Sequence, residues 1–163
     1  MNSADAPRRV RSLPSWQLNQ AASRGTRLVA ERAADLGVTR STFSILAALD
    51  EFGPSSQAEL GRRVGLDRKD VSSLVAGLEA DGLVRRGPDE RDGRRKLLEI
   101  TPHGLAMLER LDGAFTAAQD ELLAVLSIRD RVELARLLLL IADSDTASAP
   151  SNPRRDLGRA LLG

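Results

Sequence analysis

The residues of this chain best suited to chemistry are the charged side chains between positions 85 and 96. Six of them are basic and three are acidic: Arg85, Arg86, Arg91, Arg94, Arg95 and Lys96 against Asp89, Glu90 and Asp92. Guanidinium groups bind phosphate and carboxylate oxygens through charge-assisted hydrogen bonds, so this cluster suits an anionic surface. A run of charges is more often only a solvated surface, and composition alone does not separate the two interpretations.

No constellation for catalysis or metal binding accompanies the charged cluster. The sequence has no cysteine and a single histidine, His103, so it lacks the residues for a zinc site or for a nucleophile with a histidine base. It also has no phosphate-binding glycine loop and no nucleophile elbow. We therefore expect a protein that is not an enzyme and that needs no metal or cofactor.

Composition limits the kind of partner. A length of 163 residues fits one domain, and a net charge of +1 excludes a polycation, so nucleic-acid binding must depend on local charge. Aromatic residues make up only 2% of the chain, which argues against binding by base stacking. The apolar runs are too short for a signal peptide or a membrane span, so we expect a cytoplasmic protein without a membrane partner.

The charged cluster lies at the tip of a predicted β-hairpin, because short apolar runs at 83–84 and 97–100 flank it. Helix start and stop signals predict helices on both sides of the hairpin. Their approximate ranges are 13–36, 39–52, 56–64, 67–81, 102–126 and 127–143. The chain is therefore predicted to be mainly α-helical, with a minor β part.

The third and fourth predicted helices have the spacing of a helix-turn-helix. Ser56 and Glu59 form a capping box, Gly65 ends the short helix, and Asp67 caps the longer one. The longer helix leaves basic, hydroxylic or small residues outside its apolar stripe: Arg68, Lys69, Ser72, Ser73, Ala76 and Gly77. Such a face can approach phosphates and base edges in a major groove, although an ordinary solvated helix face has the same composition.

The last predicted helix contains five consecutive apolar residues, from Leu137 to Ile141. Five residues span more than one helical turn, so this part of the helix is apolar on all sides and needs burial on all sides. A small domain seldom buries a terminal helix in this way. We therefore predict a homodimer in which this helix and the first helix form the interface.

The order of elements and the hairpin motif resemble the MarR family of winged helix-turn-helix transcription regulators. The segment Asp89-Glu90-Arg91-Asp92-Gly93-Arg94 matches the family's wing pattern D-x-R-D-x-R. Residues 57–61 and 78–84 are similar to the family's helix-turn-helix region, and residues 97–104 to the strand and helix start after the wing. The resemblance covers approximately residues 15–143.

The resemblance implies a domain organisation. A winged helix-turn-helix domain would extend over 13–143, with dimerisation helices at about 13–36 and 102–143 and a DNA-binding region at about 39–101. Residues 1–12 are predicted to be a disordered N-terminus, and 144–163 a linker and C-terminal tail.

The resemblance also implies a function. A homodimeric repressor would place its two recognition helices in successive major grooves of an inverted-repeat operator, with the wings in the flanking minor grooves. The expected DNA-binding residues are Arg68, Lys69, Ser72, Ser73, Ala76, Arg91, Asp92, Arg94 and Arg95. Within this set, Asp92 is expected to hold the Arg94 guanidinium in place by charge-assisted hydrogen bonds.

Many members of the family release DNA when a small aromatic or phenolic compound binds, and the resemblance extends that expectation to this chain. Trp16 is the candidate effector-binding residue, with ordinary packing as the alternative role. Peroxide sensing by thiol oxidation is excluded because the chain has no cysteine.

A second hypothesis belongs to a different class. In it, the chain is a winged-helix dimer that acts mainly through protein partners, and the basic hairpin binds a phosphorylated or carboxylate-rich surface. Specific operator binding with a steep salt dependence separates the two hypotheses.

Overall fold

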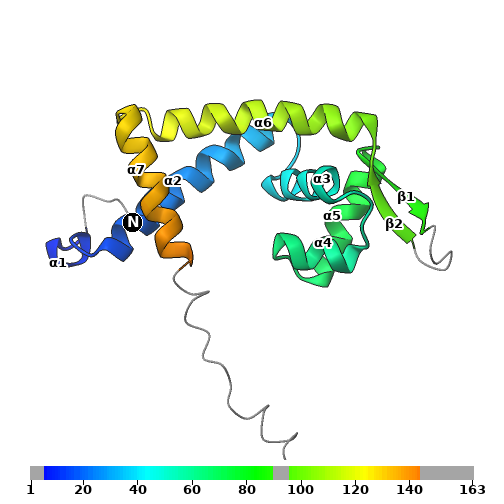
Figure 1. Ribbon diagram of the computed structural model, residues 1–163, viewed down its shortest axis with the longest axis horizontal. Coiled ribbons are helices and arrows are strands. Elements are labelled where there is room, and N and C mark those ends of the chain that lie inside the picture. The colour runs from blue at the N-terminus through cyan, green and yellow to red at the C-terminus, as the bar shows by residue number, and fades with distance from the viewer. Residues whose placement is uncertain (1–5, 90–95, 144–163) are drawn as a thin grey trace, which may run out of the picture. The chain divides into compact units, whose positions relative to one another are not determined.

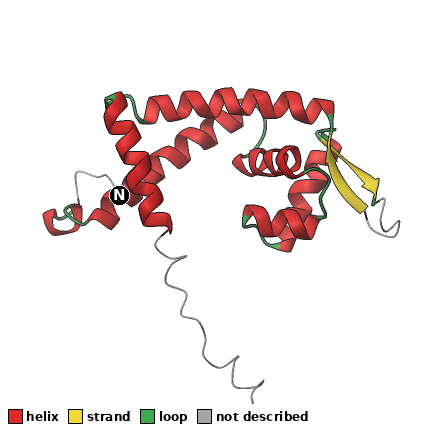
Figure 2. Ribbon diagram, viewed as in Figure 1, coloured by secondary structure: helices red, strands yellow, loops and turns green. Residues whose placement is uncertain are grey.

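The computed structural model describes residues 6–89 and 96–143 (Figure 1). The chain divides into two compact units, Met1–Leu122 and Leu123–Gly163. The described elements of the first unit are α1 (Arg8–Arg11), α2 (Pro14–Asp35), α3 (Arg40–Phe52), α4 (Gln57–Val64), α5 (Arg68–Ala80), β1 (Val84–Pro88), β2 (Lys96–Ile100) and α6 (Pro102–Leu122). The second unit contains α7 (Ile128–Asp143). Figure 2 shows a mainly helical chain with a single hairpin, which confirms the predicted fold class.

The predicted starts of α4 and α5 are present, and side chains cap both helices. The Ser56 N–H donates to Glu59 Oε2 at 2.8 Å and the Glu59 N–H donates to Ser56 Oγ at 3.3 Å, which completes the capping box of α4. The Asp70 N–H donates to Asp67 Oδ1 at 2.8 Å at the start of α5. These caps fix where α4 and α5 begin, and therefore which of their residues face outward.

The core of the first unit holds the helix-turn-helix against the hairpin. Its fully buried large side chains come from α3, α4, α5, the hairpin region and α6: Ile45, Leu46, Leu49, Leu60, Val71, Val75, Leu83, Leu98 and Leu111. Gly65 makes the turn between α4 and α5 with φ 69°, a left-handed conformation that glycine adopts without steric cost. The core therefore positions α5 through its buried side.

The hairpin pairs β1 and β2 in an antiparallel register, from Val84 opposite Ile100 to Pro88 opposite Lys96. An isolated bridge between Ser55 and Leu98 adds a short third segment. Thr101 joins the hairpin to α6, because its Oγ1 donates to Gly82 O at 2.7 Å and accepts from the Gly104 N–H at 3.0 Å. The base of the hairpin is thus tied to both the end of α5 and the start of α6.

Helices α2 and α6 pack against each other through a second, smaller cluster, in which Leu28, Val29 and Ala118 are buried. Arg32 donates to Glu121 Oε2 at 2.9 Å across the same pair of helices. The beginning of α2 lies outside this contact, and its Leu18 is 37% exposed.

Two expectations differ from the structure. Residues 1–12 were expected to be disordered, but residues 8–11 form a short helix, because Pro7 begins a turn in which the Val10 N–H bonds to Pro7 O at 2.9 Å. The helix after the hairpin was expected to reach about residue 126, but α6 ends at Leu122. There the Leu126 N–H bonds to Leu123 O at 3.0 Å in a turn. The expected linker and tail at 144–163 lie outside the described residues.

Helix α7 in the second unit carries the apolar run. Ser127 caps it, with the Asp130 N–H donating to Ser127 Oγ at 3.2 Å. The run from Leu137 to Ile141 is 42–63% exposed, and α7 has no buried residue. Five consecutive exposed apolar residues are typical of an interface with another chain.

Among the helices of the described ranges, none is long and apolar enough to cross a membrane.

Candidate nucleic-acid interface

Helix α5 divides into a buried and an exposed side. Val71, Val75 and Leu78 are almost completely buried in the core. The residues predicted to contact DNA lie on the other side and together line one open depression of the surface: Arg68, Lys69, Ser72, Ser73 and Ala76. The structure therefore brings together five of the nine predicted DNA-binding residues on one helix face, which we call the α5 face.

The α5 face combines charge with close access. Neither the Arg68 nor the Lys69 side chain has an ion-pair partner within the described residues. Ser72 and Ser73 have hydroxyl groups that donate and accept hydrogen bonds. Ala76 has only a methyl group, so another molecule can approach the helix backbone closely there. Cations, hydroxyls and a methyl group are the side-chain groups that contact phosphates, base edges and thymine methyls in a major groove.

Two of the basic hairpin residues are engaged in the fold. Arg85 Nη2 lies 2.6 Å from Glu99 Oε2 on the opposite strand, and Arg86 Nε donates to Glu79 at 2.9 Å. The second contact ties β1 to the end of α5. Arg86 thus links the hairpin to α5, and both arginines add less to a free basic surface than the sequence suggests.

The tip of the hairpin, with Arg91, Asp92, Arg94 and Arg95, lies outside the described residues. The wing part of the interface remains a prediction.

Trp16 and His103 were also singled out in the sequence. Trp16 is partly buried in the first turn of α2, so part of its indole is accessible to a ligand. His103 is exposed at the start of α6. The described residues contain no group of three or more histidine, cysteine or carboxylate side chains that could hold a metal ion.

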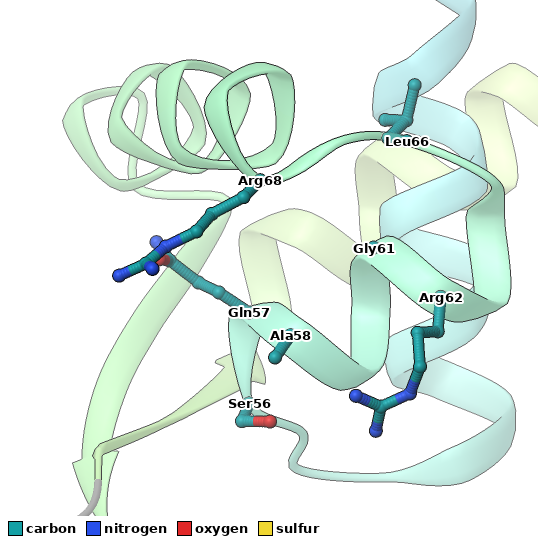
Figure 3. Close-up of a pocket in the computed structure, with 7 residues that line it drawn as sticks. All are labelled: Ser56, Gln57, Ala58, Gly61, Arg62, Leu66 and Arg68. Carbon is teal, nitrogen blue, oxygen red and sulfur yellow. The ribbon is translucent and has the colours of Figure 1, made fainter.

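Sequence reasoning missed Gln57. This residue follows Ser56 and lines a pocket at the junction of α4 and α5, together with Ser56, Ala58, Gly61, Arg62, Leu66 and Arg68 (Figure 3). Its Nε2 is buried and has no hydrogen-bond partner within the described residues. A buried amide without a partner costs about 1–3 kcal/mol of folding free energy. The capping box gave no signal for this, because its hydrogen bonds join Ser56 and Glu59 and do not involve Gln57.

The helix-turn-helix of α4 and α5, followed directly by the antiparallel hairpin, defines the class of protein. It is a winged helix-turn-helix protein, in which α5 has the position of the recognition helix and the hairpin the position of the wing.

Comparison with known proteins defines the family. The sequence model of the MarR family matches residues 36–95. The chain is 33% identical over 128 residues to the HTH-type transcriptional repressor NicR of Pseudomonas putida, covering 78% of this chain and 81% of NicR. The chain belongs to the MarR family of transcriptional regulators. This relative is a regulator and not an enzyme, in agreement with the prediction.

Solved structures have the same fold. A probable transcriptional regulator from Pseudomonas aeruginosa is 33% identical with a TM-score of 0.69, covering 80% of this chain and 97% of that one. BpsR of Bordetella bronchiseptica is 23% identical with a TM-score of 0.72, covering 85% of this chain and 99% of that one. At 23% identity the likeness to BpsR shows the fold alone.

Proposed function

We propose that the chain is a homodimeric repressor that binds double-stranded DNA at an inverted-repeat operator. The observation that carries this proposal is the α5 face, whose cations have no partner within the described residues and which lies opposite the buried side of the recognition helix. The repressor role is proposed from the similarity to NicR.

In this proposal α5 enters the major groove. Arg68 and Lys69 contact phosphates or guanine edges near the start of the helix, while Ser72, Ser73 and Ala76 face base edges. The wing carries Arg91, Arg94 and Arg95 into the adjacent minor groove, where a narrow groove concentrates negative potential. Asp92 orients Arg94 through charge-assisted hydrogen bonds.

The two-fold symmetry of the proposed dimer predicts the arrangement of half-sites in the operator. We propose that residues 39–101 bind DNA and that the helices at 13–36 and 102–143 form the dimer. Two recognition helices related by a two-fold axis then lie about one turn of DNA apart, ~34 Å, and read an inverted repeat.

Replacing Arg94 with alanine is expected to weaken DNA binding about tenfold on every sequence, and to lower the slope of log affinity against log salt concentration by about one. The loss is general because an arginine that reads groove width does not identify single bases. Fluorescence anisotropy with tiled duplexes flanking the chain's own gene, at several salt concentrations, measures both quantities.

Arg9→Ala is the matched control, because Arg9 is exposed on α1, outside the proposed DNA-binding and dimerisation segments, and carries the same charge. Nanomolar binding of the wild type to one inverted-repeat fragment supports the proposal. If Arg94→Ala binds like the wild type at every salt concentration, the role of the wing is wrong. Uniformly weak binding of the wild type to all fragments favours the protein-partner hypothesis instead.

We further propose that a small aromatic or phenolic compound releases the DNA. BpsR has its DNA binding regulated by 6-hydroxynicotinic acid, and this compound is a first choice for a panel of phenolic and heteroaromatic acids. Trp16 is the only tryptophan of the chain, so its fluorescence reports on a single position.

A compound that releases the DNA is expected to quench Trp16 fluorescence with saturation, at the same midpoint concentration as the release. Fluorescence titration and anisotropy on the same samples test this. Release without any change in fluorescence would contradict the role of Trp16, and absence of both effects across the panel would contradict the effector proposal.

A further inference from the structure

The pocket at the junction of α4 and α5 contains an amide donor that the fold does not use. Gln57 Nε2 carries two N–H donors, is buried, and has no hydrogen-bond partner within the described residues. Buried polar groups are nearly always paired, so an unpaired donor that lines an open pocket indicates a missing acceptor. Figure 3 shows the Gln57 side chain extending from the start of α4 on the side of Arg68.

The charge around this amide indicates which acceptor is missing. Arg62 from α4 and Arg68 from α5 line the same pocket, and neither has an ion-pair partner within the described residues. The nearby carboxylate of Glu59 is occupied by the N–H and hydroxyl of Ser56, at 2.8 and 2.7 Å. Two guanidinium groups and an amide donor favour a compact anion with several acceptor oxygens, such as a phosphate.

The position of the pocket indicates the source of the phosphate. Arg68 lines both this pocket and the α5 face, so the two surfaces are continuous. An anion bound in the pocket therefore lies beside the helix that we propose to enter the major groove. The phosphates next to a major groove are those of the DNA backbone, and contacts with them fix the orientation of a protein on the duplex.

We propose that this pocket binds one backbone phosphate of the DNA, with Gln57 Nε2 as a donor and Arg62 and Arg68 as the compensating charges. The inference rests on the proposed DNA-binding function and deepens it, because it assigns a site that sets the register of α5 on the duplex. Gln57 is unpaired in the free chain and becomes paired only in the complex.

Replacing Gln57 with methionine separates two effects of the amide. One is the folding free energy that it costs in the free chain, and the other is the affinity for DNA that it adds in the complex. Methionine keeps a long unbranched side chain and removes the unpaired amide, so the midpoint of thermal unfolding is expected to rise. DNA affinity is expected to fall about fivefold to tenfold, equally for operator and non-operator duplexes, because one hydrogen bond to phosphate is lost. The salt dependence stays unchanged, because Gln57 carries no charge.

Gln119→Met on the exposed surface of α6 is the matched control for the stability measurement and is expected to leave the midpoint of thermal unfolding unchanged. Arg62→Gln is expected to weaken binding and to lower the salt slope by about one. Wild-type affinity in Gln57→Met would overturn the proposal.

Operator duplexes with one neutral methylphosphonate at each position in turn locate the phosphate. One position in each half-site is expected to weaken the wild type but not Gln57→Met. Absence of any such position would overturn the inference while leaving the DNA-binding function intact, and failure of the wild type to bind any duplex would overturn both.

Titration of the free chain with inorganic phosphate distinguishes the two sources of the anion. A saturable rise in thermal stability that Gln57→Met lacks, together with no position-specific methylphosphonate effect, would identify free phosphate as the ligand and overturn the assignment to DNA.

Discussion

A Gly104→Ala variant is expected to lose about 3 kcal/mol of folding stability, because overpacking at this position meets backbone rather than a movable side chain. Gly104 is buried in the first turn of α6. A Cβ atom there would overlap the carbonyl oxygen of Leu83 and lie 2.8 Å from Ile100 Cγ1. That carbonyl is held in place, since it accepts from the Thr101 N–H at 3.1 Å.

Gly113→Ala is the control on the same helix. Gly113 is exposed, and an added Cβ would meet no atom within 4 Å. Alanine is the better helix former by about 0.8–1 kcal/mol, so this variant is expected to be more stable than the wild type. Chemical denaturation of the three chains measures the differences. Equal stability of the two variants would show that the contact between α6 and the hairpin is not tight.

The consequence of Gly104→Ala for the interface follows from the same contact. Thr101 and Gly104 connect the hairpin to α6, and Glu79 with Arg86 connects it to α5. A shifted hairpin therefore changes the distance between the α5 face and the wing. We expect the folded fraction of Gly104→Ala to bind DNA more weakly than the wild type.

The helix caps and the exposed side of α5 could be predicted from the sequence. Ser56 and Asp67 cap helices in the structure as predicted, because a cap depends only on a side chain and the backbone three residues further on. The exposed side of α5 was readable for a similar reason, since helical periodicity separates it from Val71 and Val75.

Features that depend on tertiary contacts could not be predicted from the sequence. Arg85 and Arg86 looked like free cations, but Glu99 and Glu79 engage them across the hairpin and from α5. The burial of Gln57 Nε2 without a partner depends on the tertiary packing around it, which no local pattern encodes. The apolar periodicity also continued past Leu122, where a local turn ends α6.

Replacing Leu139 with glutamate is expected to convert a dimer into monomers of 17.6 kDa and to reduce operator affinity about 10²-fold to 10⁴-fold. Leu139 is the most exposed residue of the apolar run on α7, at 63%, so a charge there does not disturb the packing of the single chain. In a dimer that buries this run, the same charge would lose its hydration without a partner.

The large loss of affinity has a physical origin in the two-fold operator. Binding of the first half-site in a dimer raises the effective concentration of the second recognition helix, and separate monomers lose this gain. Phe52→Glu is the matched control, because Phe52 is also apolar and 52% exposed but lies on α3, outside the proposed dimerisation helices. It is expected to remain dimeric.

Light scattering after size-exclusion chromatography measures the mass, and anisotropy on full and half operators measures the affinity. On a duplex with a single half-site, Leu139→Glu and the wild type are expected to bind equally, because each uses one recognition helix there. A Leu139→Glu chain that stays dimeric would place the interface elsewhere. A monomer that binds the full operator as tightly as the wild type would contradict two-fold recognition, because the second half-site would then add nothing.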